Sequence, residues 1–398
     1  MQAGTLAAGE AVLDSRRAWR SVAGGFAAMF AVFGVAYSFG AFFGPMADEF
    51  GSGRGATSFV FSITAFLYFT LNMISGPAVD RFGPKPILVF GAVVMGGGLF
   101  LTSTVESLLA GYVTYGLGVG VGVACGYVPM VAVIGGWFER RRSAALGIGV
   151  AGIGFGTVIG SPMAAALIDA HGWRTAYVIL AAVGAGLMLL AAVLTERPPR
   201  AVAGDARIGM SDRARTPEFA ALYASALLLS LALFQVFVYL PDFAEGIGVG
   251  EVPAAALVAV VGGASIAGRL GLGVVADRVG RVRTYRACFL VMGLSYGIWM
   301  AAPNYVWLVV FALVMGGSYG GFIALNPAVV AEVFGVAGLG SIMGLLYTGP
   351  GFGALLGPPL AGLIIDSAGY RWAIAASMVM AMLAWAALLP LGRTRSPR

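Results

Sequence analysis

Apolar segments separated by short polar stretches follow one another along nearly the whole chain. Windows of about 18 or more mostly apolar residues lie at 20–44, 57–79, 86–104, 108–136, 143–168, 172–195, 219–241, 253–275, 284–301, 305–330, 340–364 and 370–391. A helix of about 20 residues, rising about 1.5 Å per residue, crosses a hydrocarbon layer of roughly 30 Å. Because lipid offers the backbone no hydrogen-bonding partner, segments that cross it singly must be helices. The pattern therefore predicts an all-α membrane protein with twelve transmembrane helices.

The composition excludes the common soluble and catalytic classes. Hydrophobic residues make up 59% of the 398 residues and charged residues 11%, whereas about a quarter of the residues in soluble domains are charged. Lys85 is the only lysine and no P-loop is present, so any transport must be driven by gradients and not by nucleotide hydrolysis. The single His171 and the distant Cys125 and Cys288 supply neither a metal site nor a catalytic triad. We expect no enzymatic activity, no metal and no cofactor.

Basic residues are distributed unequally between the two sets of loops. One side carries Arg16, Arg17, Arg20, Arg81, Lys85, Arg140 to Arg142, Arg278, Arg281, Arg283 and Arg286, and the other has Arg54, Arg174 and Arg371. Since Lys and Arg accumulate in cytoplasmic loops, both termini are predicted to be cytoplasmic in a multi-pass protein of the cell (inner) membrane. The net charge of +6 then reflects topology in the lipid bilayer, and nucleic acid is not expected as a partner.

The chain repeats itself at an offset of about 200 residues. Gly76 to Gly83, read as Gly-x-x-x-Asp-Arg-x-Gly, recurs at Gly273 to Gly280. At the same offset Gly152, Gly154, Phe155, Gly156, Gly160, Pro162, Asp169, Gly172 and Arg174 match Gly349, Gly351, Phe352, Gly353, Gly357, Pro359, Asp366, Gly369 and Arg371. Shared spacing of this kind indicates two parallel six-helix halves. We place them at residues 1–195 and 219–398, joined by a polar cytoplasmic linker at 196–218.

Arg269 is the one charged residue deep inside an apolar segment. A cation at the centre of a membrane helix costs about 2.5 to 3.5 kcal/mol on insertion scales, so such residues usually face a watery path or bind an anion. The alternative is that the side chain extends to the cytoplasmic surface, which begins about eight residues, or roughly 12 Å, away at Asp277. We favour a binding site for an anion.

The repeated Gly-x-x-x-Asp-Arg-x-Gly motif, followed by basic residues, resembles the signature loop of the major facilitator superfamily. It contains Asp80 and Arg81 between the second and third helices, and Asp277 and Arg278 between the eighth and ninth. The resemblance implies the major facilitator fold, with these charges holding the halves together in one of two alternating states. Asp80 has the cluster around Arg141 available as partner, whereas Asp277 has no matching cluster. We call ion pairs of these motif residues the latch, and we expect it to be asymmetric, with Asp80 paired and Asp277 not. The alternative is that these charges only set the topology.

Several stretches are more specifically similar to monocarboxylate porters and their bacterial oxalate/formate-type relatives. They are Tyr37 to Gly51 with Arg54, Thr57 to Ser62, and Tyr127 to Gly147. The resemblance implies that Arg269 binds the substrate carboxylate. Two departures matter: Ser265 stands where the animal carriers have an aspartate, and Pro350 stands where the oxalate carrier has a lysine. With one cation left, a second carboxylate would be buried unpaired at large cost, so we expect a monocarboxylate.

Polar and aromatic residues within the segments are the candidates to line the path. Beside Arg269 the predicted substrate-binding residues are Tyr37, Asn72, Tyr127, Ser265, Asn326, Tyr347 and Phe352, and Gln235 and Tyr319 are further candidates. Hydroxyl and amide groups orient a small anion, and aromatic rings suit its apolar tail. Asn72 occupies the position equivalent to Arg269 in the first half. The alternative for each residue is packing between helices or against lipid.

The sequence as a whole predicts a secondary transporter for a small monocarboxylate of lactate, pyruvate or formate size, working by alternating access and coupled to protons. No Asp or Glu lies in the middle of a span, and Asp242 and Glu245 follow the seventh one. One of these acids would take the proton from outside and release Arg269 to the anion. The alternatives are carboxylate exchange, with both acids ordinary loop residues, and a membrane-embedded solute sensor.

Overall fold

The computed structural model describes residues 13–199, 214–335 and 339–391, and within them the chain is helical and contains no strand. The helices are α2 (Arg16–Tyr37), α3 (Phe39–Phe50), α4 (Arg54–Phe82), α5 (Pro84–Thr102), α6 (Leu108–Gly111), the π-helix η1 (Tyr112–Leu117), α7 (Gly118–Gly126), α8 (Val128–Trp137), α9 (Arg142–Leu194), α11 (Pro217–Gly246), α12 (Glu251–Val279), α13 (Arg281–Ala301), α14 (Tyr305–Phe334), α15 (Leu339–Ala368) and α16 (Tyr370–Ala387). Most of the predicted linker, residues 200–213, and both termini lie outside the described residues.

Ten helical stretches among the described residues are long and apolar enough to cross a membrane. One of them contains the predicted fifth and sixth segments, because α9 runs on for 53 residues and changes direction at Gly172, whose φ of 78° is not helical. The predicted ninth segment is α13, 21 residues long, which lies outside the ten and begins with Arg281, Arg283 and Arg286. The prediction of an all-α protein with many membrane-spanning helices is confirmed.

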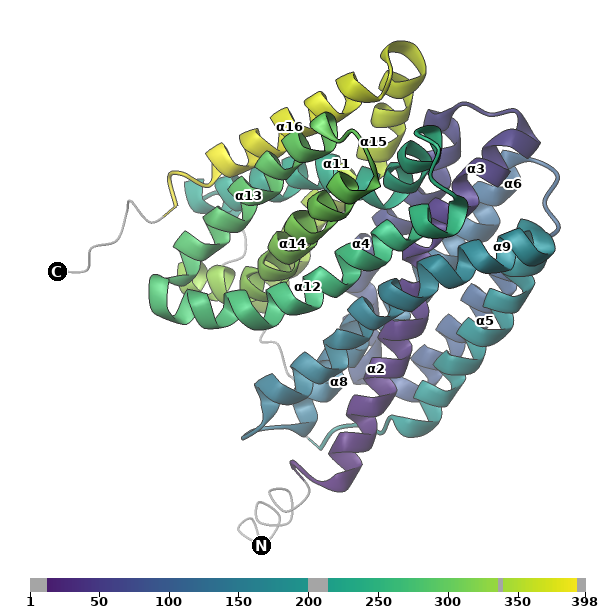
Figure 1. The fold of residues 1–398 in the computed structure, drawn as a ribbon. Helices are drawn as coiled ribbons and strands as arrows, with labels where there is room; N and C mark the ends of the chain where they lie inside the picture. The colour runs from purple at the N-terminus through teal and green to yellow at the C-terminus, as the bar shows by residue number, and fades with distance from the viewer. Residues whose placement is uncertain (1–12, 200–213, 336–338, 392–398) are drawn as a thin grey trace, which may run out of the picture.

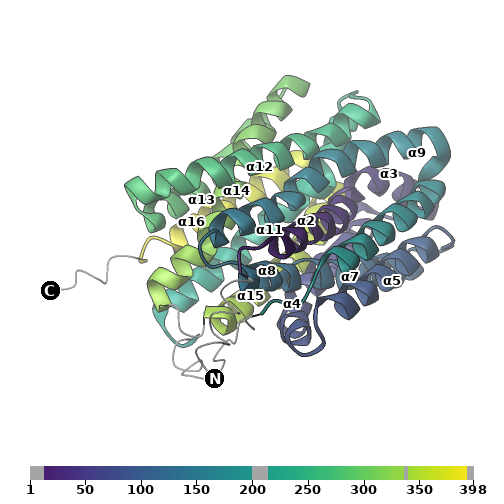
Figure 2. The ribbon, with the colours of Figure 1, turned by 90° about the horizontal axis from the view of Figure 1, so that it is seen from below.

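The helices form two groups that lie side by side (Figures 1 and 2). Helices α2 to α9 pack against one another, as do α11 to α16, and the groups meet through the pairs α4 with α15, α9 with α12, and α3 with α11. We call them the N-terminal and C-terminal groups. Any cavity between the two groups is therefore lined by residues that are far apart in the sequence.

The internal repeat of the sequence has a counterpart in how the helices touch. A methyl group added at Gly156 would lie 2.4 Å from the carbonyl oxygen of Phe30, and one at Gly353 would lie 2.5 Å from that of Leu227. Gly156 and Gly353 are equivalent positions of the repeat, and so are Phe30 and Leu227. Close backbone approach of this kind holds membrane helices together by van der Waals contact. The same contact is thus built twice, α9 on α2 and α15 on α11.

Two helices are interrupted near their middle. The first apolar stretch bends after Tyr37, where α2 ends and α3 begins, and the fourth is broken at Tyr127, whose φ and ψ of −100° and −83° separate α7 from α8. Pro129 follows the second break and has no N–H to continue the helix. Irregular backbone at this depth is tolerated where it is buried in protein or lines a cavity. Each break places a tyrosine at the boundary between the groups.

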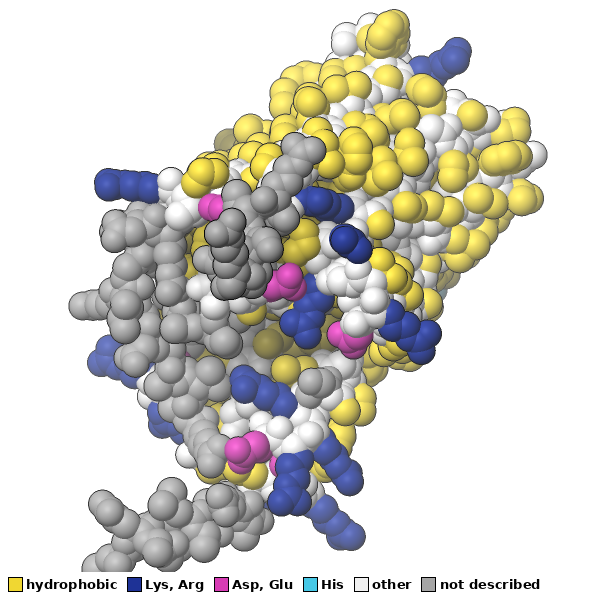
Figure 3. Space-filling view, turned by 90° about the vertical axis from the view of Figure 1, so that its left-hand side faces the viewer, with side chains coloured by type: hydrophobic (Ala, Val, Ile, Leu, Met, Phe, Trp, Pro, Cys, Tyr) yellow, Lys and Arg dark blue, Asp and Glu magenta, His cyan; other side chains and the backbone are white. Residues whose placement is uncertain are grey.

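The two ends of the molecule differ in charge. At one end, where α2 and α11 begin and α4 and α12 end, basic side chains gather, including Arg81, Arg140 and Arg278; we call it the basic end. Figure 3 shows Lys and Arg side chains on this face around a hollow with hydrophobic side chains in its depth, and a mostly hydrophobic flank beside it. The opposite end, which contains the turns at residues 51–53 and 247–250, is called the sealed end for the contacts given below.

Candidate functional site

A cavity lies between the two groups, and its empty space, counted together with open solvent, is about 790 Å³. Its lining comes from α2, α4, the break before α8 and α9 on one side, and from α11, α14 and α15 on the other. Four of the predicted substrate-binding residues line it, namely Tyr37, Tyr127, Asn326 and Tyr347, and so does the further candidate Tyr319. Most of the remaining lining is aromatic or aliphatic, as in small-molecule sites generally.

An aromatic cluster closes the cavity toward the sealed end. The hydroxyl groups of Tyr37 and Tyr319 form a hydrogen bond of 3.2 Å across the two groups, and the ring of Tyr37 stacks on Phe237 with centroids 4.3 Å apart. The lining extends the other way as far as Leu222, in the second turn of α11 at the basic end. The cavity therefore reaches from mid-height toward the basic end.

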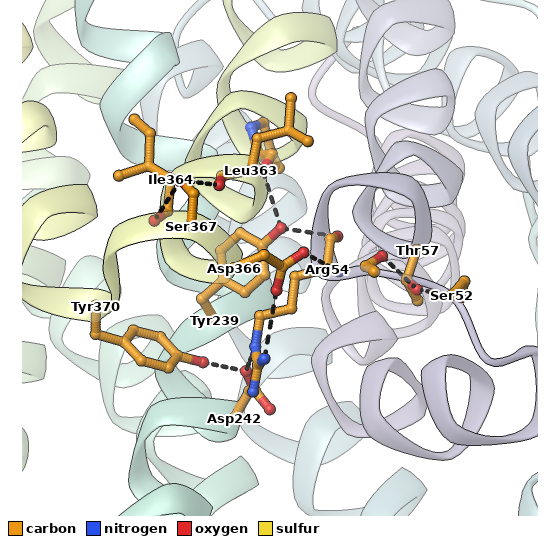
Figure 4. A network of polar contacts seen from close by, with 12 residues as sticks. Ser52, Arg54, Thr57, Tyr239, Asp242, Leu363, Ile364, Asp366, Ser367 and Tyr370 are labelled. Atoms are coloured by element: carbon orange, nitrogen blue, oxygen red, sulfur yellow. Dashed lines mark hydrogen bonds and ion pairs between the residues drawn. The ribbon is translucent and has the colours of Figure 1, made fainter.

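The sealed end is held by ion pairs around Arg54, shown in Figure 4. Its Nε lies 3.0 Å from Oδ2 of Asp242 and its Nη1 lies 3.4 Å from Oδ1 of Asp366. The Arg54 backbone N–H also donates to Asp366, at 2.8 Å, and the Tyr370 hydroxyl donates to Asp242. Tyr239 donates to the Arg54 carbonyl oxygen at 3.0 Å. Because Arg54 belongs to the N-terminal group and its partners to the C-terminal group, these contacts close this end.

Arg269, in α12, is half-buried and does not line the cavity. Its Nη1 donates to the carbonyl oxygen of Val150 in α9, at 3.2 Å, so the side chain crosses from one group to the other. Its positive charge acts on the hydroxyl groups of Tyr37, Tyr127 and Tyr319. Its Nε is buried and has no hydrogen-bond partner among the residues that the structure describes. The side chain thus joins α12 to α9 through Nη1.

Besides Arg269, three predicted substrate-binding residues do not line the cavity. Ser265 is 2% exposed, and its backbone packs so tightly on α14 that a methyl group at Gly320 would lie 2.0 Å from its carbonyl oxygen. Asn72 is 7% exposed, and neither of its amide atoms has a partner. Phe352 is 44% exposed on the outer surface and contacts Phe66, with ring centroids 5.4 Å apart.

The further candidate Gln235 also faces away from the cavity. Its amide nitrogen donates to the Ser377 hydroxyl of α16, inside the C-terminal group.

Several cavity residues were not predicted from the sequence. They are mainly aromatic: Phe33, Tyr68, Phe69, Phe234 and Phe322. Phe33 lies one helical turn before Tyr37 and Tyr68 one turn before Asn72, so the rule that residues four apart share a helix face would have found these two. The other phenylalanines carry no such signal, because an apolar side chain in an apolar helix suits lipid equally well.

The predicted latch at the basic end is not engaged in this conformation. Asp80 has no ion pair in the described part of the chain; its carbonyl oxygen accepts a hydrogen bond from Arg197. Arg81 instead lies over the ring of Phe82, at 5.1 Å. Asp277 and Arg278, equally, form no ion pair with another described residue. The three ion pairs among the described residues all lie at the sealed end: the two of Arg54, and that of Arg174 with Glu49, at 2.6 Å.

Arg141, the predicted partner of Asp80, is held through its backbone. The N–H groups of Arg141, Arg140 and Glu139 donate to the Asp14 carboxylate at 3.2, 3.3 and 3.4 Å. Desolvation, the largest single effect, raises the pKa of Asp14, but the hydrogen bonds from Arg140, Glu139 and Arg141 and the charge of Arg140 together outweigh it and hold this pKa below its ordinary value. The segment before α2 is thereby attached to the loop between α8 and α9.

Membrane-length helices in two groups, with a cavity between them that is closed at one end, are the architecture of a membrane transport protein. The family model described as Major Facilitator Superfamily matches residues 25–281 and 266–398. The chain belongs to this superfamily, whose members are transporters and not enzymes.

Proteins of similar sequence show to which family within the superfamily the chain belongs. The chain is 30% identical over 363 residues to Monocarboxylate transporter 3 of Rattus norvegicus, covering 85% of this chain and 73% of that protein. It is 28% identical over 397 residues to Monocarboxylate transporter 12-B of Danio rerio, covering 89% and 83%. The Fujikurins efflux protein of Gibberella fujikuroi is 29% identical over 318 residues, covering 78% and 68%. Within the superfamily the chain belongs with the monocarboxylate porters, as the sequence stretches predicted.

Proposed function

We propose that this protein is a secondary transporter that moves a monocarboxylate anion across the cell (inner) membrane by alternating access. Its two parallel six-helix halves would be residues 1–195 and 219–398, with 196–218 as linker. Counting the two arms of α9 around Gly172 and adding α13 to the ten apolar stretches supports twelve spans. The excess of arginine at the basic end supports a cytoplasmic location for that end and for both termini.

Arg269 is the observation that carries this proposal. The unpaired Nε of a half-buried guanidinium between α9 and α12 is costly unless an anion accepts from it. The tyrosines on which its charge acts, Tyr37, Tyr127 and Tyr319, line the cavity. A carboxylate there would accept hydrogen bonds from Arg269 and from those hydroxyls. The names of the two monocarboxylate transporters among the relatives support the same substrate class.

The contacts at the two ends support a cycle between two states. With the Arg54 ion pairs and the Tyr37–Tyr319 hydrogen bond formed, the described conformation would be open only toward the cytoplasm. We propose that Asp80, Arg81, Arg141, Asp277 and Arg278 form their latch when the basic end closes and the sealed end opens. This would explain why Asp80, Asp277 and Arg278 form no ion pair with a described residue here although the motif is present twice.

Purified protein in proteoliposomes tests the proposal directly. Radiolabelled pyruvate or another monocarboxylate should accumulate in response to an imposed gradient. Binding without accumulation would contradict transport and would favour a sensor.

Because Arg269 is the one cation predicted for the site, we expect the protein to distinguish monocarboxylates from dicarboxylates. Dicarboxylates such as oxalate should compete for uptake at least about tenfold worse than monocarboxylates of similar size, a difference of about 1.4 kcal/mol. The physical reason is that their second carboxylate would be buried without a partner, since Pro350 lines the cavity where a cation would be needed. Competition at neutral pH measures this, and oxalate as the strongest competitor would show that the one-cation argument is wrong.

Proton coupling would act at the sealed end. The partners of Asp242 are Arg54 and Tyr370 and not Arg269, so the structure gives no support to direct release of Arg269 by this acid. We propose instead that protonation of Asp242 weakens its attraction to Arg54 and so favours opening to the outside. Glu245 is exposed one turn further along α11, where it can deliver the proton.

Uptake under an inward proton gradient tests this coupling. Wild type should take up more substrate with the gradient than after an ionophore collapses it, and the Asp242→Asn variant should lose most of that response. Glu245→Gln should reduce it if this residue relays the proton. A wild-type rate indifferent to the gradient would instead favour carboxylate exchange, and a full response in both variants would exclude these two acids.

A further inference from the structure

One amide side chain lies among the described residues that line the cavity, that of Asn326 in α14. The other polar groups of the lining are hydroxyls, those of five tyrosines and of Ser230. A hydroxyl can rotate to donate or to accept a hydrogen bond, whereas an amide presents a donor or an acceptor according to which end faces the ligand. The orientation of the Asn326 amide therefore decides which kind of ligand atom it can bind.

A tyrosine behind the cavity wall sets this orientation. The hydroxyl of Tyr285, in α13, donates to Oδ1 of Asn326 at 3.1 Å. Tyr285 is 1% exposed and is not among the residues that line the cavity. Its ring contacts those of Phe289 and Phe322, whose centroids lie 4.9 and 5.8 Å from its own. The packed ring thereby holds the hydroxyl beside the amide.

The burial of Tyr285 makes the reversed amide unfavourable. With the amide nitrogen of Asn326 in the place of Oδ1, the nitrogen could still donate to the Tyr285 hydroxyl, but the proton of that hydroxyl would lose its acceptor. A buried donor without an acceptor is costly, so Oδ1 stays toward Tyr285. The amide nitrogen, which carries two hydrogens, is then the end that is turned away from Tyr285 and is available to the cavity.

Two tyrosines that line the cavity extend this donor into a polar cluster. The Tyr347 hydroxyl interacts with both the Asn326 amide and the Tyr127 hydroxyl, and the positive charge of Arg269 acts on Tyr127. Because the amide nitrogen has two hydrogens, Asn326 can donate to Tyr347 and to a ligand at once. Tyr127 belongs to the N-terminal group, and Asn326 and Tyr347 belong to the C-terminal group. An anion bound at this cluster therefore contacts both groups.

We propose that Tyr285 is a positioning residue for the substrate: it holds the Asn326 amide with its N–H groups toward the cavity, where they donate to the carboxylate. This inference rests on the proposed function and adds to it a specificity determinant outside the cavity lining. A carboxylate accepts hydrogen bonds and donates none. A donor that cannot turn away therefore favours an anion over a neutral ligand of similar shape.

The Tyr285→Phe variant tests this role, because it removes one oxygen atom and keeps the ring contacts. Uptake into proteoliposomes is measured with radiolabelled formate, pyruvate and lactate, and the acid that the parent protein takes up best is used for every variant. The KM of Tyr285→Phe for uptake should be at least about tenfold higher than that of the parent, with a maximal rate within about twofold. The reason is that the released amide can turn its oxygen toward the anion.

Two more variants show whether Tyr285 acts through Asn326. Asn326→Ala should raise the KM by a similar factor, and adding Tyr285→Phe to it should raise the KM no further, since the effects of residues that act through one contact are not additive. Tyr296→Phe, in the same helix, is the matched control. The Tyr296 hydroxyl is buried outside the cavity lining and donates to the Ala232 carbonyl oxygen at 2.6 Å. Its removal should leave the KM at the parent's value.

The results separate this inference from the function on which it rests. An unchanged KM in Tyr285→Phe, an equal rise in Tyr296→Phe, or a further rise when Tyr285→Phe is added to Asn326→Ala would overturn the positioning role and leave monocarboxylate transport intact. If Asn326→Ala does not fold, the comparison of Tyr285→Phe with Tyr296→Phe still decides. If the parent takes up none of the three acids and none raises its melting temperature, the proposed function fails and this inference with it.

Discussion

Replacing Arg269 with alanine is expected to lower carboxylate uptake by roughly a hundredfold or more. Hydrogen bonds to charged groups contribute about 1.5 to 3 kcal/mol each, and two bonds from one guanidinium to one carboxylate therefore correspond to a factor of at least about a hundred. The Val150 carbonyl oxygen and the nearby tyrosine hydroxyls cannot replace the charge. Initial rates of uptake into proteoliposomes measure the loss.

Two further variants make this result specific. Arg269→Lys should recover little activity, because a single ammonium keeps the charge and loses the planar pair of donors. Arg281→Ala, at an exposed position of the basic end, removes an arginine of the same kind outside the cavity and should transport normally. Near-normal uptake by Arg269→Ala would show that its side chain serves only to pack the helices.

Replacing Arg54 with alanine is expected to open the sealed end. The change removes two ion pairs that join the N-terminal and C-terminal groups. Exposed pairs contribute about 0.2 to 1 kcal/mol each, and together with the lost cation contact to Tyr370, at 5.7 Å, the shift approaches 1.4 kcal/mol, or about tenfold in population.

Thiol labelling measures that shift. Ser230 lines the cavity and is 5% exposed, so Ser230→Cys, in a background with Cys125 and Cys288 replaced by alanine, reports on access from outside. A membrane-impermeant reagent applied at the sealed end should label it about tenfold faster once Arg54 is alanine.

Arg174→Ala is the matched control for the open gate. Its ion pair with Glu49, at 2.6 Å, also lies at the sealed end but stays inside the N-terminal group. Its labelling rate should equal that of the parent. Equal rates in all three proteins would contradict a gate at Arg54, whereas faster labelling in both variants would point to general loosening.

Most of the fold could be predicted from the sequence because lipid imposes a simple rule on it. Long apolar runs must be helices, and the predicted segments correspond to the helices even where two of them run together in α9 around Gly172. The polar start of α13, with Arg281 and Arg283, makes that segment the least apolar of them. It was still predicted from the sequence as the ninth segment. Gly156 and Gly353, two of the glycines that mark the repeat in the sequence, are also positions of close helix packing.

The candidate site was predicted only where a residue was chemically out of place. Arg269 could be found because its charge is exceptional in an apolar segment, and Tyr37, Tyr127 and Tyr347 because hydroxyl groups are less common there. The same reasoning also selected Ser265, which faces α14. A polar residue in a membrane helix has several ways to be accommodated, and its identity does not say which one is used.

By itself the sequence determined the class of protein, the apolar segments and the internal repeat, and it predicted Arg269 as the residue that binds an anion. Only the tertiary structure decided which face of each helix meets the cavity: Phe69 and Phe322 line it and Phe352 does not. Only the tertiary structure, too, showed that Arg54 forms ion pairs between the two groups, whereas Asp80 forms none with a described residue. The reason is physical: lipid and protein interior are equally apolar, so a membrane helix carries little periodic signal of its buried face. Ion pairs between distant segments, in turn, depend on which of two conformations brings them together.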